Sequence, residues 1–446
     1  MHIGETMPII FCLPFVGMLL SIAIMPLVAS VWWEKNMKFM VVLWSVLCLI
    51  PLAIKYTPVV MAEILCKVVV GEYITFIILL FGLYCVAGNI SIKGNFKGTP
   101  KMNVILLLIG TLLASWIGTT GASMLMIRPI MKANSWRKRK VHTIVFFIFL
   151  VANLGGCLTP VGDPPLLMGF MRGVPFFWSL HLAPILLLNG AILLILYGIL
   201  DKRAYKKDLE EFSIPVCADE KVNLKIDGLH NVVFIVMIVG AVILSGALPN
   251  IPAFAGGIHI MGDVEFGYAA IIEIIIILIA TGLSMKTTKK RVRISNQFTW
   301  GPIKEVAILF IGIFITMEPA LLFLEAHGGK LGITEAWQMF WVTGALSSFL
   351  DNTPTYLVFL TTAGTLGASS GIVTQVGTIA PIILMAISAG AVCMGANTYI
   401  GNAPNLMVRS IAEESGIKMP SFFGYMACSV GVLIPIFVID MLVFFL

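Results

Sequence analysis

The sequence predicts an all-α polytopic membrane protein built from two inverted repeats, each with a re-entrant hairpin and a broken transmembrane helix. Composition indicates the membrane, because 59% of the 446 residues are hydrophobic and only 12% are charged, more apolar surface than a soluble chain could bury. A repeated motif indicates the broken helices, since Gly156-x-x-Thr159-x-x-Gly162-x-x-Pro165 returns as Gly395-x-x-Thr398-x-x-Gly401-x-x-Pro404. Non-helical backbone persists inside a bilayer only where protein or a cavity satisfies it, so both motifs are expected beside a binding site.

Apolar runs near the length of about 20 residues that a spanning helix needs recur along the chain. The predicted spans are 8–31, 38–55, 73–91, 142–171, 176–200, 231–250, 266–285, 303–324, 372–411 and 422–446. The first run has no basic segment before it and no convincing cleavage site, so we interpret it as a spanning helix and not as a signal peptide.

Two further runs, 102–131 and 335–362, are too long for one ordinary span and carry helix-breaking sequence at their centres. The breaks are Gly118 to Ser123 in the first run and Asp351 to Thr355 in the second. An arm of about 15 residues reaches about 22 Å at 1.5 Å per residue, which is shorter than a full crossing. Both runs are therefore predicted to be re-entrant hairpins with tips near the middle of the bilayer.

Loop charges predict that the hairpins enter from opposite faces. Lysines and arginines flank both ends of the first hairpin, in the segments 93–101 and 132–140, whereas Lys330 is the only one in 326–334 and 363–371, which flank the second hairpin. Under the positive-inside rule the ends of the first hairpin are cytoplasmic and those of the second are external. The net charge of +6 thus fixes orientation and does not indicate nucleic-acid binding.

These elements recur in the same order and predict five regions. They are N-terminal scaffold helices (1–72), the first repeat (73–200, with broken helix 142–171), a polar cytoplasmic linker (201–230), further scaffold helices (231–302) and the second repeat (303–446, with broken helix 372–411). Inverted repeats with discontinuous helices are typical of secondary transporters. A helical scaffold with glycine-rich packing seams would explain the glycines but not the matched order of elements.

Polar residues at the four breaks are the predicted substrate- or ion-binding residues. They are Thr119, Thr120 and Ser123 on the first tip, Asn352, Thr353 and Thr355 on the second, Asn153, Gly156 and Thr159 at the first broken helix, and Asn397, Thr398, Asn402 and Asn405 at the second. Side-chain oxygens and the carbonyls freed by unwound backbone suit a hard cation such as sodium. The alternative for any single hydroxyl or amide is a helix cap or an interhelical hydrogen bond.

Two carboxylates stand out, because a charge at membrane depth costs about 2.5 to 3.5 kcal/mol even on insertion scales. Asp163 lies in the first broken helix and Asp351 on the second tip, so each is predicted to pair with a cation or carry a proton. The predicted sodium ligands are Asp351, Asn352, Thr353 and Asp163. A helix cap is the alternative for both aspartates. Asn402 occupies the place of Asp163 in the second copy of the motif.

At these motifs the chain resembles a known family. The stretches Gly118–Ser123, Leu158–Pro165, Leu350–Thr355 and Gly395–Asn405 are similar to the citrate transporter and sodium:proton antiporter branch of the ion transporter superfamily, which also holds D-type antiporters. The resemblance implies an elevator-type secondary transporter, with the tips and broken helices moving past a scaffold in a homodimer. Dicarboxylate members carry Ser-Asn-Thr on each tip, whereas here only Asn352 and Thr353 of the second tip match.

An anion beside an ionised Asp351 would be repelled in a low-dielectric site unless sodium or a proton intervened. The predicted function is therefore sodium:proton antiport, with Na⁺ and H⁺ sharing an intramembrane carboxylate site. The alternative is sodium- or proton-coupled transport of citrate or another dicarboxylate. Either transporter would lie in a lipid bilayer, which we expect to be a bacterial inner membrane, and would need no cofactor beyond the transported or coupling ion.

An enzyme is disfavoured. In an intramembrane aspartyl protease two aspartates share a proton, but Pro160 replaces the first glycine that its Gly-x-Gly-Asp motif needs before Asp163. The Pro-Ala-Leu tripeptide of such proteases also precedes Asp351 here instead of following both aspartates. The chain has no phosphate-binding glycine loop, so gradients and not ATP hydrolysis are expected to drive transport.

Overall fold

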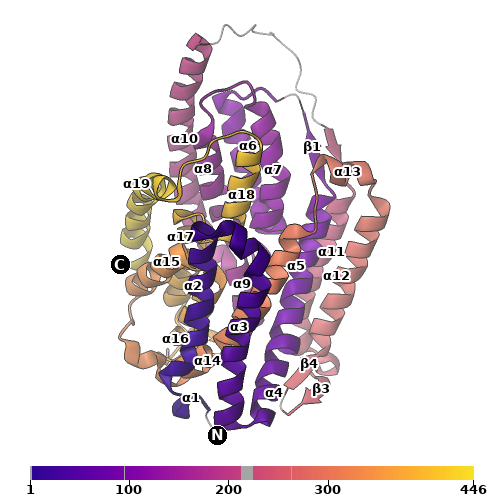
Figure 1. Ribbon diagram of the computed structural model, residues 1–446, viewed down its shortest axis with the longest axis vertical. Helices are drawn as coiled ribbons and strands as arrows, with labels where there is room; N and C mark the ends of the chain where they lie inside the picture. The colour runs from indigo at the N-terminus through magenta and orange to yellow at the C-terminus, as the bar shows by residue number, and fades with distance from the viewer. Residues whose placement is uncertain (1–2, 95, 212–224, 263) are drawn as a thin grey trace.

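The computed structural model describes residues 3–94, 96–211, 225–262 and 264–446, and it is mostly helical (Figure 1). Ten helical segments of this part of the chain are long and apolar enough to cross a membrane. They are Ile9–Val28, Val31–Tyr56, Pro58–Gly88, Pro100–Ile117, Val141–Leu158, Phe176–Glu211, Asn231–Asn250, Tyr268–Thr287, Gly301–Leu331 and Phe422–Phe445. The predicted multi-pass membrane protein is confirmed.

The helices and strands follow one another along the chain with few long loops. The α-helices are α1 (Ile3–Thr6), α2 (Leu13–Val28), α3 (Ser30–Tyr56), α4 (Pro58–Cys66), α5 (Ile74–Gly88), α6 (Pro100–Ile117), α7 (Thr119–Ala133), α8 (Val141–Leu150), α9 (Pro164–Met171), α10 (Ala183–Glu211), α11 (Asn231–Ala247), α12 (Tyr268–Thr287), α13 (Lys290–Ser295), α14 (Gly301–His327), α15 (Ala336–Phe349), α16 (Asn352–Gly364), α17 (Pro381–Met394), α18 (Ala403–Glu414) and α19 (Phe422–Asp440). The strands are β1 (Ser91–Lys93), β2 (Lys225–Asp227), β3 (Gly257–Met261), β4 (Val264–Gly267), β5 (Ile372–Thr374) and β6 (Gly377–Ile379).

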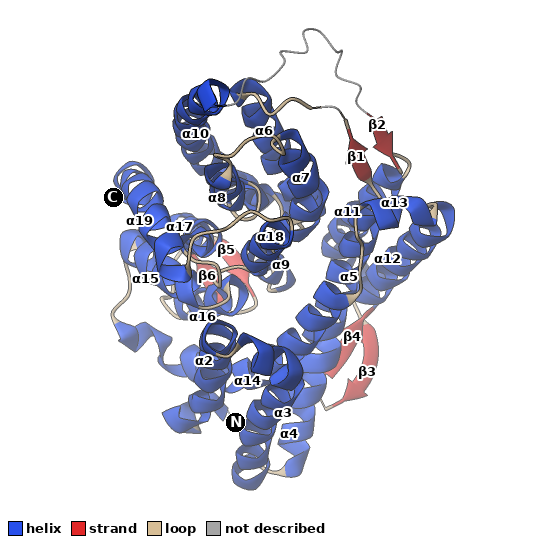
Figure 2. Ribbon diagram, turned by 45° about the horizontal axis from the view of Figure 1, so that its top comes forward, coloured by secondary structure: helices blue, strands red, loops and turns tan. Residues whose placement is uncertain are grey.

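The helices form two groups that lie side by side (Figure 2). One group, which we call the wall, consists of α2 to α5, α11, α12 and α14, and these helices pack on one another. The other, which we call the core cluster, consists of α6 to α10 and α15 to α19. The two groups meet where α5 contacts α7 and α14 contacts α16. The predicted hairpins and broken helices all belong to the core cluster.

Both predicted hairpins contain a helix break at the expected place. α6 and α7 pack against each other and are joined at Gly118, whose φ of +78° requires glycine. α15 and α16 pack likewise and are separated by Leu350 and Asp351. The 18 residues of α6 make this arm longer than the expected 15 or so. Entry of each pair from one membrane face stays a prediction.

Several predicted boundaries differ from the structure. The run predicted to start at 73 is the end of one continuous helix from Pro58 to Gly88, which includes a π-helical segment, Lys67–Tyr73. The boundary drawn at 72/73 therefore falls inside a helix. At the other end of the first repeat, α10 continues to Glu211 instead of ending near 200, because its polar end packs against the segment around Arg137. Residues 212–224 of the predicted linker lie outside the described part.

The described residues are mostly helical, as predicted, but they also include six short strands that form three two-stranded antiparallel ribbons. β1 pairs with β2, so the segment after α5 is tied to the described end of the linker. β5 and β6 occupy the start of the run 372–411, whose first helix begins only at Pro381. Gly371 and Gly377 have positive φ values, and the β-branched residues between them favour extended backbone.

Candidate substrate and ion site

Four short helices begin close to one another in the core cluster. They are α7 and α16 after the hairpin breaks, and α9 and α18 after the unwound segments of the two broken helices. Prolines at the first turns of α9 and α18 favour helix starts at those points, since the missing N–H is unpaired there anyway. The backbone N–H of Thr119 donates to the carbonyl of Gly162 at 2.9 Å, so the first tip contacts the first broken helix directly.

Asp163 lies at the centre of this arrangement with 1% of its surface exposed. Thr119 donates its hydroxyl to Oδ1 at 3.0 Å, and the Nδ2 of Asn352 donates to Oδ2 at 2.7 Å. The Nδ2 of Asn402 donates to Oδ1 at 3.3 Å. Asp163 occupies the N-cap position of α9 but makes no side-chain cap hydrogen bond there. Its carboxylate instead joins both hairpin tips and the second broken helix.

Buried amides link the two broken helices behind Asp163. Asn153 donates from Nδ2 to Oδ1 of Asn405 at 2.8 Å, and its own Oδ1 accepts from Asn402 at 3.3 Å. Asn405 in turn donates to the carbonyls of Gly395 and Thr398, both at 2.9 Å. These bonds satisfy carbonyls that the unwound segment frees. The predicted asparagines are thus brought together.

The threonines of the repeated motif hold the breaks in place. Thr159 donates its hydroxyl to the carbonyl of Ser115, and Thr398 donates to that of Ser348, so each break is pinned to the first arm of the hairpin in its own half. Ser115 and Ser348 were missed in the sequence, although each stands three residues before a hairpin tip. Thr159 and Thr398 thus make the interhelical hydrogen bonds that were considered as the alternative to ion or substrate binding.

The motif glycines allow the backbone of each broken helix to fold closely on itself. A Cβ atom at Gly162 would clash with the carbonyl of Gly156, and one at Gly401 would clash with that of Gly395. A Cβ at Gly156 would also press on Thr119 and Asp163. Glycine is therefore needed at these positions for space and not for a positive φ.

Asp351 is half-buried and caps α16. Its Oδ1 accepts from the backbone N–H of Thr353 at 3.0 Å, and its carbonyl accepts the Thr355 hydroxyl at 2.9 Å. Of the four predicted sodium ligands, Asn352 and Asp163 are in direct contact, whereas Asp351 and Thr353 bond to each other. Within the described ranges, no three His, Cys, Asp or Glu residues form a metal-binding group.

The remaining predicted residues lie around this site. Ser123 Oγ and Asn397 Oδ1 are buried and have no hydrogen-bond partner in the described structure. The Nδ2 of Asn397 donates to the hydroxyl of Ser348 at 2.9 Å. Thr120 lines a small, mostly apolar cavity between the first tip and the wall. The cavity is lined by Leu80, Leu83, Tyr84, Ile117, Gly118, Thr119, Thr120, Gly121, Val161, Gly162, Pro164, Pro302, Ile303 and Val306.

Broken helices that converge on one buried carboxylate, in a chain whose described residues include ten helical segments long and apolar enough to cross a membrane, are typical of the class of secondary membrane transporters. Residues 4–445 match the model of the family described as Putative citrate transport, and the chain belongs to this family. No curated protein matches the chain significantly. The protein is therefore a transporter and not an enzyme, and membership of the ion transporter superfamily is consistent with the match. The family favours the citrate alternative over sodium:proton antiport.

Proposed function

We propose that the protein is an elevator-type transporter that moves citrate or a similar carboxylate together with protons or sodium ions, with Asp163 as the coupling residue. The observation that carries the proposal is the convergence on Asp163 of Thr119, Asn352 and Asn402, which belong to both hairpin tips and the second broken helix. The family match supports a citrate-like substrate.

Electrostatics gives the reason for coupling. An ionised Asp163 would repel a carboxylate substrate strongly at low dielectric, and its recorded hydrogen-bond donors are all neutral. A proton or a sodium ion on Asp163 removes this repulsion. The amides of Asn352 and Asn402 and the N-termini of four helices then become donors for an anion. Substrate and coupling ion are therefore expected to bind together.

The small cavity between the wall and the first tip marks the side from which a substrate would approach this site. Thr119 and Thr120 contribute to its lining, and Thr119 also contacts Asp163. We propose that the core cluster moves past the wall, as in the elevator mechanism implied by the family resemblance. From the same resemblance we expect a homodimer in a bacterial inner membrane.

Sodium:proton antiport remains the second candidate, and one observation favours it. The recorded partners of Asp163 include no lysine or arginine, although such residues commonly bind substrate carboxylates in proteins. A site built from one carboxylate, amides and hydroxyls also suits a cation that exchanges with a proton.

Purified protein in liposomes tests both candidates in one preparation. Uptake of radiolabelled citrate and succinate is measured under inward proton, sodium, lithium or potassium gradients, while an internal dye reports pH. We expect citrate uptake that is driven by protons or sodium and that is lost in Asp163→Asn. Asp351→Asn, the same change at the other predicted aspartate, is measured for comparison. Sodium-driven proton release without carboxylate uptake would replace the proposal with antiport, and undiminished coupled uptake in Asp163→Asn would refute the role of Asp163.

A further inference from the structure

A second buried carboxylate lies behind the broken helices, where α10 packs against α19. Asp440 of α19 and Asn189 of α10 have 0% and 1% of their surfaces exposed, and Asn189 Nδ2 donates to Asp440 Oδ2 at 2.8 Å. The other oxygens of the pair, Asp440 Oδ1 and Asn189 Oδ1, are buried and have no hydrogen-bond partner in the described structure. Two oxygen atoms of the pair therefore lack a hydrogen-bond donor, and an ionised Asp440 has no proton to donate to Asn189 Oδ1.

An ionised carboxylate in this environment is poorly compensated. The recorded contacts of Asp440 supply one neutral amide donor, and no ion pair with a lysine, arginine or histidine is recorded for it among the described residues. Burial of an unpaired charge is far more costly than burial of a neutral hydrogen-bonded group. A proton on Oδ1 would remove the charge and turn an unsatisfied acceptor into a donor.

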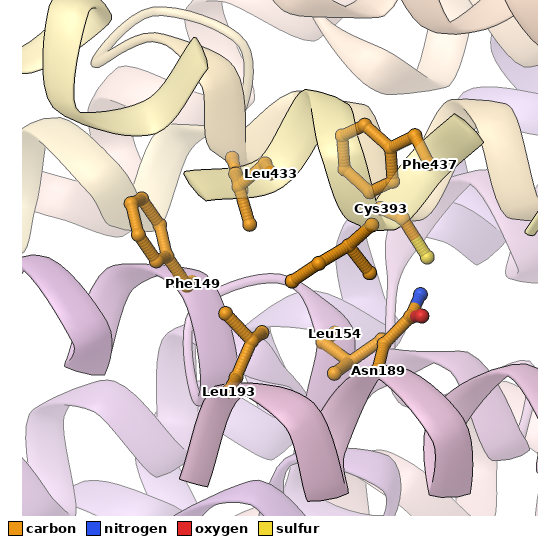
Figure 3. Close-up of a pocket in the computed structure, with 9 residues that line it drawn as sticks. Phe149, Leu154, Asn189, Leu193, Cys393, Leu433 and Phe437 are labelled. Atoms are coloured by element: carbon orange, nitrogen blue, oxygen red, sulfur yellow. The ribbon is translucent and has the colours of Figure 1, made fainter. Parts of the chain in front are cut away.

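The surroundings of Asn189 favour a proton over a metal ion. Asn189 lines a very small cavity whose other lining residues are apolar apart from the thiol of Cys393 (Figure 3). A sodium ion wants several oxygen ligands, which this lining does not offer.

The cavity connects the pair to the breaks of both repeats. Leu154 belongs to the 3₁₀ segment Leu154–Leu158 of the first broken helix, and Ala396 belongs to Gly395–Asn397 of the second. Cys393, near the end of α17, is the titratable side chain among the lining residues of this cavity. Asn189, the hydrogen-bond partner of Asp440, thus shares one cavity with both broken helices.

We propose that Asp440 is a second proton-binding site, which takes up one proton in the state described here and releases it when movement of the core cluster changes its access to water. This inference rests on the proposed function, because a proton at Asp440 then adds one positive charge to each transport cycle. Asn189 acts as a positioning residue that holds Oδ2 while Oδ1 carries the proton.

Asp440→Asn separates a proton site from a simple interhelical hydrogen bond, because the amide retains the shape and a hydrogen bond to Asn189 but cannot titrate. Infrared difference spectra of the full-length protein between acidic and alkaline pH should contain a protonated-carboxyl band that Asp440→Asn loses and Asp163→Asn retains. In liposomes, proton-driven citrate uptake should fall at least about tenfold in Asp440→Asn, while citrate counterflow without a gradient continues. Asn189→Leu keeps the carboxylate and should retain the band.

The infrared spectra test the proton site, whereas the uptake measurements also test the proposed substrate, so the two claims can be rejected separately. If wild-type protein moves no citrate but the band is lost in Asp440→Asn, the proton site stands and the proposed substrate is wrong. If Asp440→Asn retains both the band and the full proton dependence of transport, the pair is only an interhelical hydrogen bond and the inference is overturned. Asp440→Glu, which keeps an acid, restores the band if the loss reflects titration and not misfolding.

Discussion

Asn352 donates a hydrogen bond of 2.7 Å to the carboxylate of Asp163, although the two residues are 189 positions apart. Asn352 begins α16 on the second tip, and Asp163 precedes α9 in the first broken helix. Residues of both predicted repeats therefore belong to one site. The site is asymmetric, because the position equivalent to Asp163 in the second broken helix is Asn402, which itself bonds to Asp163.

Replacement of Asn352 by alanine should change the binding of the coupling ion at Asp163. A hydrogen bond to a charged group contributes about 1.5 to 3 kcal/mol and stabilises the ionised carboxylate, so its loss should raise the apparent affinity for a coupling proton about 10- to 100-fold. The measurement is uptake as a function of proton or sodium concentration. Thr362→Ala is the matched control, because Thr362 lies on the same helix and its hydroxyl donates to the Val358 carbonyl, away from Asp163. Equal affinities in the two variants would contradict a role for Asn352.

The sequence predicted the elements of this site well, because their signals are local. Gly118, the prolines after Asp163 and Asn402, and the repeated glycines each break a helix by their own backbone chemistry. The breaks were therefore located to within a few residues. Which of the two aspartates occupies the centre could not be predicted, because the contact of Asp163 with Asn352 depends on the packing of distant segments.

Other features depend on partners that sequence periodicity does not contain. α10 continues past the apolar run because Asp201 and Asp208 bond to Arg137, which is distant in sequence. The ribbon of β5 and β6 is made of apolar and β-branched residues that resemble the start of a spanning helix by composition. Burial of Asp440 was not anticipated, because its only recorded donor, Asn189, comes from the other repeat.

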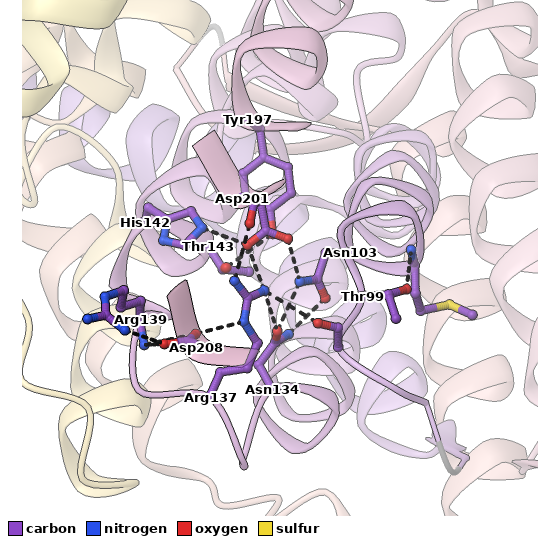
Figure 4. Close-up of polar contacts among 12 residues, drawn as sticks. Thr99, Asn103, Asn134, Arg137, Arg139, His142, Thr143, Tyr197, Asp201 and Asp208 are labelled. Atoms are coloured by element: carbon purple, nitrogen blue, oxygen red, sulfur yellow. Dashed lines mark hydrogen bonds and ion pairs between the residues drawn. The ribbon is translucent and has the colours of Figure 1, made fainter. Parts of the chain in front are cut away.

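Arg137 should be essential for the stability of the core cluster. It is fully buried and forms ion pairs with Asp201 at 2.6 Å and Asp208 at 3.3 Å (Figure 4). Loss of one partner from such a buried network leaves uncompensated charge and costs about 3 to 5 kcal/mol. Arg137→Met should therefore lower the thermal unfolding midpoint in detergent by several degrees. Lys138→Met removes only the exposed pair with Glu211 and should leave the midpoint within error, and equal midpoints for both variants would refute the prediction.

Labelling of single cysteines tests the inverted topology. Lys97 precedes α6 and Ser370 follows α16, and both residues are exposed. If the hairpins enter from opposite faces, Lys97→Cys should react with an impermeant maleimide only in inside-out vesicles, and Ser370→Cys only in intact cells. The 8 native cysteines are replaced by serine in both variants. Reaction of both positions from one side would reject the inverted repeats.

Movement of the core cluster past the wall should break the ion pair between Arg172 and Glu72. Arg172 follows α9 of the core cluster, Glu72 belongs to the π-helical segment of the wall, and their side chains approach to 2.7 Å. Crosslinking of Glu72→Cys with Arg172→Cys by a bifunctional thiol reagent, which spans the length of the two original side chains and is cleaved by a reductant, should therefore stop transport by at least about 90%. The reductant should restore transport if rigid domains slide past each other.

The wall itself provides the matched control for this crosslink. Lys67 and Glu318 form a second ion pair at 2.7 Å, and both residues belong to wall helices. The same thiol reagent between cysteines at these two positions joins elements that are expected to stay together, so uptake should continue at near the uncrosslinked rate. Full transport by the crosslinked Glu72→Cys, Arg172→Cys variant would exclude relative motion at this contact, and inhibition by both crosslinks would place moving parts inside the wall.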